Sequence, residues 1–476
     1  MMTDAWRDAY SVPSGVAARG HVRVPPSKSL AHRALICAAL ASGTSRVGPL
    51  PDGDDVAATL ECLRALGAVV REWGAGSGEP QAGSGEQGRG SREPSGETAS
   101  VPPVSRFTSH FSLQGAEDGG QEASRTVVVS GASGRFAAPR APLACGASGT
   151  TLRLLMGLCG AMEGAFTLDG ADQLRKRPVS DLEAPLRALG ARVSYAEREG
   201  YPPAIVEGHR WAGGEVAVPG SVSSQFLSGL LLGAPFARAP VAFAAPHLVS
   251  ASYAAMTAAV MERFGVEVRH PEESLWKVAP ASYRPARFAV EPDASSAAFL
   301  WAAAAVTGGE VLVEGTGGES LQGDAVFPDL LEHMGCRVQR GTAGVTVAGH
   351  PLRGLDADCS STPDLVPALA AVAAFAPEPS TFRGVAHLRF KESDRLAVLS
   401  DALSRLGATV LLQEGRMTVV PAVACRGAEL DPQGDHRMAM AFAVLGLRIP
   451  GVSIAQPSCV AKSFPNFFNI LEGLLS

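Results

Sequence analysis

The chain has 476 residues, 46% of them hydrophobic, which at roughly 100–200 residues per domain predicts two to four domains. Its formal net charge is −6, from 41 Lys and Arg against 47 Asp and Glu. This mildly acidic balance excludes the broad basic surface of a general nucleic-acid-binding protein, so an anionic ligand needs cations that are gathered locally.

The sequence shows no sign of a metal, a redox pair or a membrane segment. Its eight cysteines form no CxxC pair, and neither a metal-ligand motif nor a nucleotide-binding Gly-rich loop is present. We therefore expect no metal and no cofactor. The first residues lack the apolar run of a signal peptide, and the apolar stretches fall short of the ~20 residues of a membrane span. We expect a soluble, cytoplasmic monomer that binds neither nucleic acid nor membrane.

Six Ala- and Leu-rich segments, each opening on a small polar cluster, are predicted to be helices. In chain order they are SKSLAHRALICAAL, GASGTTLRLLMGLCG, SVSSQFLSGLLLGA, DASSAAFLWAAAAV, STPDLVPALAAVAAF and GDHRMAMAFAVLGL. Residues 74–124, between the first two, differ from the rest because they are rich in Gly, Ser, Glu, Gln and Pro. Such a segment has too few apolar residues to offset the entropy of ordering, so we expect a disordered insertion there.

A second set of helices is predicted to end at glycine and to lead into a β-branched strand, as a C-terminal cap does. The sequence LRALGA and its variants mark these ends at 63–68, 186–191, 262–268, 332–338 and 404–410. A last helix is expected at about 466–475. Short strands are predicted between the paired helices, for example at 43–50, 164–170 and 309–315.

This recurrence indicates six βαβ-type units that carry two helices each, three to a domain. We expect a first domain over residues 27–288, which includes the insertion, and a second domain over residues 289–476. The N-terminal strand within residues 1–26 is expected to pair with the second domain, because something must close that sheet.

Cations stand at several predicted helix starts, where plain capping by Ser, Thr or Asp does not explain them. Lys28 and Arg437 are examples, because a helix N-terminus disfavours a cation unless an anion is bound there. A further run of cations precedes Pro178, which suits the first position of a helix. Helix N-termini gather at one edge of an open α/β sheet, so these groups are expected to share a cleft for phosphate and carboxylate ligands. Two carboxylates among the cations, Asp364 and Glu392, are either structural ion pairs or proton-transfer groups.

Seven segments resemble those of the EPSP synthase family, in the same order: PPSKSLAHRA, GASGTTLRLL, SVSSQFLSGLL, EPDASSAAF, FKESDRL, GDHRMAMA and AKSFPNFF. The resemblance implies an α/β fold of two similar domains, each of three βαβαββ repeats, in an inside-out barrel-like arrangement. It also implies an enolpyruvyl transferase that closes around shikimate 3-phosphate and phosphoenolpyruvate. The expected reaction transfers the carboxyvinyl group to the 5-hydroxyl, releases phosphate and lies on the shikimate pathway to chorismate and the aromatic amino acids.

The resemblance also implies roles for individual residues. The expected catalytic residues are Asp364, Glu392 and Lys28. The expected ligands of shikimate 3-phosphate are Lys28, Ser29, Arg33, Ser223, Ser224, Gln225, Ser250, Tyr253, Asp364, His387 and Lys391. The expected ligands of phosphoenolpyruvate are Lys28, Gly149, Thr150, Arg177, Gln225, Arg395, Arg437 and Lys462, with Arg175 as the alternative to Arg177.

Two positions depart from the family pattern, and two other functions are considered. Ala147 stands where the family commonly has Asn, and His387 stands where some members have a substrate-binding Asn. One alternative function is the transfer of the same group to UDP-N-acetylglucosamine, which uses a loop cysteine as proton donor, whereas Cys145 precedes a turn. The other is a non-catalytic repeat scaffold that binds an anionic metabolite, which would not need both Asp364 and Glu392.

Overall fold

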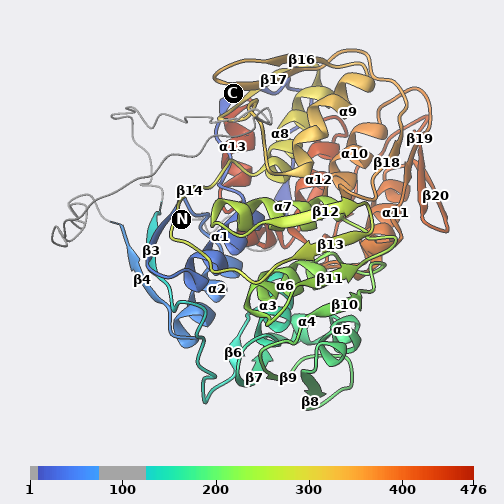
Figure 1. The fold of residues 1–476 in the computed structure, drawn as a ribbon. Helices are drawn as coiled ribbons and strands as arrows, with labels where there is room; N and C mark the ends of the chain where they lie inside the picture. The colour runs from blue at the N-terminus through green and yellow to red at the C-terminus, as the bar shows by residue number, and fades with distance from the viewer. Residues whose placement is uncertain (1–8, 74–124) are drawn as a thin grey trace, which may run out of the picture.

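The computed structural model describes residues 9–73 and 125–476, so the predicted insertion at 74–124 lies outside the described residues. The described strands form six sheets. In Figure 1 the helices and strands between residues 28 and 289, blue to yellow-green, occupy one side of the molecule, and those after residue 289, yellow to red, occupy the other.

Three of the sheets belong mainly to the first half. The first contains, in spatial order, β14 (Arg287–Ala289), β3 (Thr44–Gly48), β5 (Val127–Ser130) and β4 (Val69–Glu72). The second contains β6 (Leu143–Ala144), β7 (Gly164–Asp169), β9 (Ala204–Gly208) and β8 (Arg192–Tyr195). The third contains β10 (Gly214–Ala217), β11 (Val241–Ala244), β13 (Leu275–Val278) and β12 (Val268–Glu272). The inner helices are α1 (Lys28–Leu40), α3 (Gly149–Cys159) and α6 (Gln225–Gly233). The other helices are α2 (Asp54–Ala65), α4 (Asp172–Arg175), η2 (Ser180–Leu182), α5 (Glu183–Ala188), η3 (Ala234–Phe236) and α7 (Ala251–Arg263).

The second half repeats this plan. Its first sheet contains, in spatial order, β16 (Arg337–Arg340), β17 (Gly344–Ala348), β15 (Glu310–Glu314) and β2 (Arg19–Val22). Its second sheet contains β18 (Asp356–Asp358), β19 (Ser380–Arg383), β21 (Arg416–Val420) and β20 (Thr409–Gln413). Its third sheet contains β1 (Ala9–Ser11), β23 (Ser453–Ala455) and β22 (Glu429–Leu430). The inner helices are α8 (Ala294–Thr307), α10 (Val366–Ala373) and α12 (His436–Gly446). The other helices are η4 (Gly323–Val326), α9 (Phe327–His333), η5 (Pro363–Leu365), η6 (Ala386–Phe390), α11 (Arg395–Arg405), η7 (Pro457–Lys462) and α13 (Phe467–Gly473).

All six sheets combine one parallel strand pair with an antiparallel neighbour. Strands β1 and β2, which precede α1, join sheets of the second half, whereas β14 completes a sheet of the first half. The chain is therefore an α/β protein of six βαβαββ units arranged as two similar domains. The domain bounds of 27–288 and 289–476 stay a prediction.

The glycine caps predicted from the sequence are confirmed. Five helices end just before a glycine in the left-handed region, with φ between 81° and 104°, at Gly67, Gly190, Gly265, Gly335 and Gly407. Only glycine adopts this conformation without steric cost. Each glycine turns the chain from the helix into the strand that follows.

The expected helix start at Pro178 is wrong. The short helix α4 ends at Arg175, and the next helical residues begin at Ser180. The backbone in between bonds elsewhere, because the Val179 N–H donates to the Gly200 carbonyl at 2.8 Å and the Pro178 carbonyl accepts from Arg153 at 2.9 Å. These groups are therefore used in tertiary contacts, not in a first helical turn.

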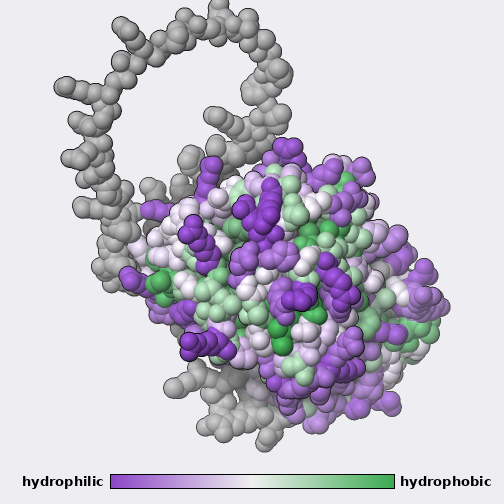
Figure 2. Space-filling model, turned by 60° about the horizontal axis from the view of Figure 1, so that its bottom comes forward, coloured by the Kyte–Doolittle hydropathy of each residue, from purple (hydrophilic) through white to green (hydrophobic). Residues whose placement is uncertain are grey.

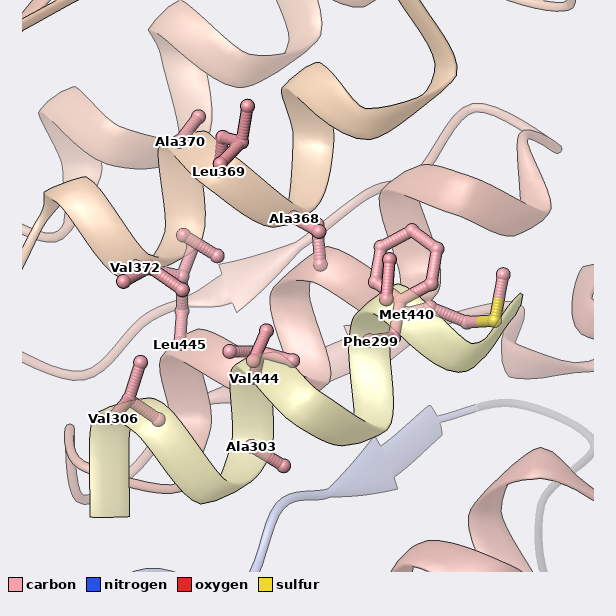
Figure 3. Close-up of a cluster of buried hydrophobic side chains, with 14 of the residues drawn as sticks. Phe299, Ala303, Val306, Ala368, Leu369, Ala370, Val372, Met440, Val444 and Leu445 are labelled. Carbon is pink, nitrogen blue, oxygen red and sulfur yellow. The ribbon is translucent and has the colours of Figure 1, made fainter. Parts of the chain in front are cut away.

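The inner helices form the core of each domain. In the second domain α8 is buried on all sides, and Figure 3 shows its Phe299, Ala303 and Val306 among side chains of α10 and α12. In the first domain α3 and α6 approach so closely that a Cβ at Gly157 would lie 2.6 Å from the Gly229 carbonyl carbon. On the face drawn in Figure 2, hydrophilic side chains surround small, scattered apolar areas.

Candidate active site

Asp364 lies at the centre of a group of charged side chains in the second domain. Its Oδ1 lies 2.8 Å from Arg395 Nη1 and 3.9 Å from Lys391 Nζ. Its Oδ2 lies 3.0 Å from Arg437 Nη2. Asp364 precedes α10, Arg395 begins α11, and Arg437 stands in the first turn of α12. Three helix starts therefore bring these charges together.

Glu392 lies just before α11 and gathers cations from both domains. Its carboxylate lies 2.9 Å from Arg395 Nη2 and 3.6 Å from Lys462 Nζ. From the first domain, Arg177 Nη1 lies 4.0 Å from Glu392 Oε1. Gln173 adds a second contact between the domains, because its Nε2 donates to the Glu392 backbone carbonyl at 3.4 Å.

Arg395 is the most buried of these cations, with 1% of its side chain exposed. Its Nε donates to Asp435 Oδ2 at 2.7 Å, and its terminal nitrogens also reach Asp364 and Glu392. Asp435 caps α12 as well, because its Oδ1 accepts from the backbone N–H of Arg437 at 3.0 Å. Arg395 and Asp435 therefore hold the two carboxylates in fixed positions relative to each other.

Both carboxylates are ionised near neutral pH. Burial by itself would raise the pKa of Asp364, but the neighbouring cations, Arg437 first, lower it well below its ordinary value. Burial would also raise the pKa of Glu392, but its cations, Lys462 first, lower it well below the usual range. Among the described residues, five cations lie within 4.0 Å of Asp364 or Glu392, and with Asp435 included they face three carboxylates. The cluster therefore favours an anionic ligand.

Lys28 lies beside this cluster. It is the first residue of α1, and its Nζ lies 3.0 Å from Asp55 Oδ2. Burial would raise the pKa of Asp55, but Lys28 and then Lys462 lower it below its ordinary value. Lys462 belongs to the second domain, and a Cβ at Gly53 would lie 3.0 Å from its carbonyl oxygen. The domains therefore meet closely where Lys28 stands.

Arg177 lies against the start of α3. A Cβ at Gly149 would lie 2.5 Å from Arg177 Nη1, so the absence of a side chain at Gly149 leaves room for the guanidinium. Arg175 instead pairs with Asp169 at 2.6 Å and Glu197 at 3.0 Å. Of these two arginines, the structure brings Arg177 into the charged cluster and leaves Arg175 outside it.

Gln225, the first residue of α6, connects that helix to α3. Its Nε2 donates to Thr150 Oγ1 at 3.0 Å, and its Oε1 accepts from Arg153 Nη1 at 3.2 Å. Arg153 is 2% exposed and also donates to the Pro178 carbonyl, next to Arg177. Burial, and then repulsion from Arg177, lowers the pKa of Arg153 to about 9. Arg153 therefore fixes the orientation of the Gln225 amide.

The expected serine ligands lie at two helix starts. Ser223 and Ser224 are buried before α6, and Ser223 Oγ accepts from the N–H of the first α6 residue at 3.3 Å. Ser250 precedes α7, and its Oγ lies 3.3 Å from His387 Nε2 in the second domain. Burial, and then Lys391, lowers the pKa of His387 to about 3, so its ring is neutral.

Arg33 is directed away from the charged cluster. It is 1% exposed, its Nε donates to Thr257 Oγ1 at 2.7 Å, and its terminal nitrogens donate to the Ser29 and Tyr253 carbonyls at 2.8 and 3.1 Å. In the structure, Arg33 therefore packs α1 against α7. The Tyr253 hydroxyl, in contrast, lies 2.9 Å from Asp364 Oδ2.

Sequence reasoning assigned no site role to five buried polar residues that contact or adjoin these groups. They are Asp55, Arg153, Asp324, Asp435 and His436. An acid near a helix start is indistinguishable from a cap in a sequence. Arg153 did carry a signal, since a charge inside the apolar run of α3 requires a buried partner. Both ring nitrogens of His436 are buried without a hydrogen-bond partner, and burial lowers its pKa well below the ordinary value, so the ring is neutral.

Across residues 9–73 and 125–476, no three His, Cys, Asp or Glu side chains are grouped so that they could hold a metal ion. The helices of these same residues include none with the length and apolar character needed to cross a bilayer.

Comparison with known sequences places the chain in one family. The family model for EPSP synthase (3-phosphoshikimate 1-carboxyvinyltransferase) matches residues 13–91 and 112–471. A 3-phosphoshikimate 1-carboxyvinyltransferase of Methanoculleus marisnigri is 41% identical over 457 residues, 95% of this chain and 96% of that protein. The enzyme of the same name from Syntrophobacter fumaroxidans is 40% identical over 467 residues, 97% of this chain and 98% of that protein.

Solved structures agree with the sequence matches. EPSP synthase from Acinetobacter baumannii superposes with a TM-score of 0.73 at 26% identity and covers 98% of both chains. An enolpyruvyl transferase from Streptomyces tendae, at 19% identity, shares the fold with a TM-score of 0.71 over 98% of this chain and 97% of that one. With the sequence match across almost the whole chain, these findings show that the protein belongs to the EPSP synthase family.

Proposed function

We propose that the protein transfers the carboxyvinyl group of phosphoenolpyruvate to the 5-hydroxyl of shikimate 3-phosphate and releases phosphate. This reaction yields 5-enolpyruvylshikimate 3-phosphate on the route to chorismate and the aromatic amino acids. The observation that carries the proposal is the pair of ionised carboxylates, Asp364 and Glu392, held among five cations from both domains. Family membership supplies the identity of the two substrates.

The two substrates are assigned to neighbouring parts of the cluster. Shikimate 3-phosphate would contact the side that joins α6 and α7 to Asp364, through Lys28, Ser29, Ser223, Ser224, Gln225, Ser250, Tyr253, Asp364, His387 and Lys391. Phosphoenolpyruvate would lie towards Glu392, through Lys28, Gly149, Thr150, Arg177, Gln225, Arg395, Arg437 and Lys462. Arg33 supports this site by joining α1 to α7, because its donors are already bonded to those helices.

Asp364 is the proposed acceptor of the proton from the 5-hydroxyl. Asp364 is ionised, and anionic substrates that bind Arg437, Lys391 and Arg395 would draw these cations from it, raise its pKa and so make it a stronger base. The hydroxyl oxygen then adds to C2 of phosphoenolpyruvate while C3 takes a proton, which gives a tetrahedral intermediate. Loss of phosphate and of one C3 proton from that intermediate leaves the new enol ether.

Glu392 and Lys28 are the proposed proton-transfer groups at C3. Glu392 is ionised while its cations face it, and anionic groups of phosphoenolpyruvate would compete for the same cations. That competition raises the pKa of Glu392 when the substrate binds and enables it to carry a proton. The cations themselves would stabilise the negative charge that develops during the reaction.

A single chain suffices for this proposal, because both halves of one chain supply the site residues; we therefore propose a monomer. Transfer to UDP-N-acetylglucosamine is disfavoured by the surroundings of Cys145, the cysteine that directly precedes the turn before α3 in the sequence. Cys145 is fully buried, and its hydrogen bond with Cys62 and its burial raise the pKa of its thiol well above the ordinary value. A thiol in that position is poorly suited to serve as a mobile proton donor.

Phosphate release measured with phosphoenolpyruvate and each acceptor tests the proposal. We expect phosphate with shikimate 3-phosphate and none with UDP-N-acetylglucosamine. The opposite pattern would assign the protein to the other transferase reaction. Binding of both substrates without any phosphate release would indicate a non-catalytic scaffold.

A further inference from the structure

The hydroxyl of Tyr253 lies between two carboxyl groups. Its oxygen is 2.9 Å from Asp364 Oδ2 and 3.1 Å from Asp324 Oδ2. Burial first, and then both acids, raise the pKa of Tyr253 well above its ordinary value, so the hydroxyl keeps its proton. A neutral tyrosine has one proton to donate, which can satisfy one carboxylate only. The second contact becomes a hydrogen bond only when one of the two acids is protonated.

Asp324 is better suited than Asp364 to hold that additional proton. Three cations lie within 4.0 Å of Asp364. In the described part of the chain, the side chain of Asp324 has no salt-bridge partner, and its hydrogen-bond partners are the hydroxyls of Ser295 and Tyr253. Its Oδ1 is buried without a partner, which costs a neutral acid less free energy than a carboxylate.

The groups around Asp324 also favour its neutral form. Asp324 stands in η4, with Tyr253 of α7, Ser295 and the cap Asp293 of α8, and Asp364 of η5 around it. Burial, and then Asp364, raise the pKa of Asp324 to about 6, against the opposing effect of Arg437 on α12.

The adjoining helix α9 also carries charges, and these are paired elsewhere. Its Asp329 and Glu332 pair with Arg340 on the surface, and His333 Nδ1 lies 2.7 Å from the Asp329 carbonyl oxygen. They therefore do not compensate the charge of Asp324.

We propose that Asp324 is a positioning residue for the transfer reaction: as a neutral acid it donates to the Tyr253 hydroxyl, which in turn donates to Asp364. This inference rests on the proposed function in so far as Asp364 is the base. These two consecutive hydrogen bonds fix the direction of the Tyr253 hydroxyl and leave Asp364 Oδ1 and its cations to face the substrate. When Asp324 ionises, two carboxylates compete for one proton, and a further negative charge lies beside the site of an anionic substrate.

The sign of the pH effect follows from this arrangement. The competent form has Asp324 protonated, so kcat/KM for shikimate 3-phosphate decreases as the pH rises through the pKa of Asp324. Anionic substrate binds the protonated form better, so the loss is expected mainly in KM.

Two substitutions separate the neutral acid from a merely structural carboxylate. D324N keeps an N–H donor for the Tyr253 hydroxyl and has no proton to lose, so it is expected to retain most of the turnover while losing this pH dependence. D324A removes the donor and is expected to lower kcat/KM by about 10- to 100-fold. D329N removes one surface carboxylate of α9 and is the matched control, with an unchanged pH profile. The proposal would be overturned if D324N lost as much kcat/KM as D324A, or if D324N kept the wild-type pH profile.

A second measurement does not depend on activity. NMR of the wild-type protein with carboxyl-labelled aspartate is expected to show an aspartate that titrates near pH 6, and D324N is expected to lack that resonance. If this titration is found without any phosphate release, the proposed function fails and the hydrogen bonds from Asp324 through Tyr253 to Asp364 stand. If phosphate is released but the resonance that D324N removes has no raised pKa, the role of Asp324 fails and the proposed function stands.

Discussion

The charged side chains at this site are paired with one another, so replacing one residue changes the chemistry of its partner. After burial, Arg437 has the largest effect on the pKa of Asp364, and its Nη2 lies 3.0 Å from Asp364 Oδ2. Arg437 is also a proposed ligand of phosphoenolpyruvate. Its removal therefore acts on a substrate and on the proposed base at once.

We expect R437A to raise the pKa of Asp364. Arg437 is the cation that lowers this pKa most, and without it the burial of Asp364 favours the protonated acid more strongly. The same variant should weaken the use of phosphoenolpyruvate far more than the binding of shikimate 3-phosphate. Carboxyl-detected NMR titration measures the first effect and steady-state kinetics the second, with R175A as a control outside the cluster. Equal losses for the two substrates, with no change in the titration of Asp364, contradict the assignment.

D364A is expected to reduce turnover by about 10²- to 10⁴-fold, the usual contribution of a general base. Affinity for shikimate 3-phosphate should fall only modestly, because Lys391 loses its carboxylate partner and remains free to bind an anion. Single-turnover kinetics and equilibrium binding separate the two quantities. Near-normal turnover would remove Asp364 from the role of base.

The site residues differ in how far a sequence can predict them. Lys28 and Arg437 were predictable because a cation at a helix start requires an anion nearby. That Arg33 is directed away from the charged cluster could not be predicted, since its partner Thr257 is 224 residues away in the sequence. Asp324 resembles an ordinary acid in the sequence, and only the fold brings it to Tyr253.

At the scale of the elements, the glycine-capped helix ends were predictable, and so were the starts of inner helices such as α1 and α8. A glycine that follows an apolar helical turn is enough to predict the end of a helix from the sequence, as at Gly67 and Gly407. The residues after Arg177 begin no helix at Pro178 because their backbone bonds to Arg153 and Gly200, which lie elsewhere in the sequence. Local patterns cannot reveal such tertiary partners.

The start of α12 allows the cap and the ion pair of Asp435 to be tested separately. An amide at this position still accepts from the Arg437 N–H, so D435N keeps the cap and removes the buried charge that faces Arg395. We expect D435N to lower the free energy of unfolding by about 1–3 kcal/mol, because one buried ion pair is lost while Arg395 keeps Asp364 and Glu392 as partners. The matched control is D394N, which keeps the exposed cap of α11 and should change stability by about 0.5 kcal/mol or less. Denaturant unfolding that shows equal effects of the two variants would contradict the role of the pair.

At the scale of the whole molecule, the repeats predicted six units, and the strands of residues 9–73 and 125–476 form six sheets. The repeats do not specify which strand completes each sheet. Strand β2 lies near the N-terminus, but it pairs with β15, which follows the first domain in the sequence. The two domains also touch beyond the charged cluster, since the Ser250 N–H donates to the Ser360 carbonyl at 2.7 Å and Ser252 Oγ donates to the Ser361 carbonyl at 2.5 Å. The proposed site is therefore completed only when the domains meet.

This dependence predicts a change of shape on substrate binding. The side chains of Arg177, Glu392 and Lys462 are only 11–14% exposed where the domains meet, so substrates need the domains to separate before they can enter. Excess positive charge at this junction opposes closure, and two anionic substrates offset it. We expect small-angle scattering to show a smaller radius of gyration with both substrates than without them. R177A, which lacks one proposed ligand of phosphoenolpyruvate, should need higher substrate concentrations for the same compaction, whereas R175A should behave like the wild type. Scattering profiles that stay unchanged at saturating substrates would show that closure does not assemble this site.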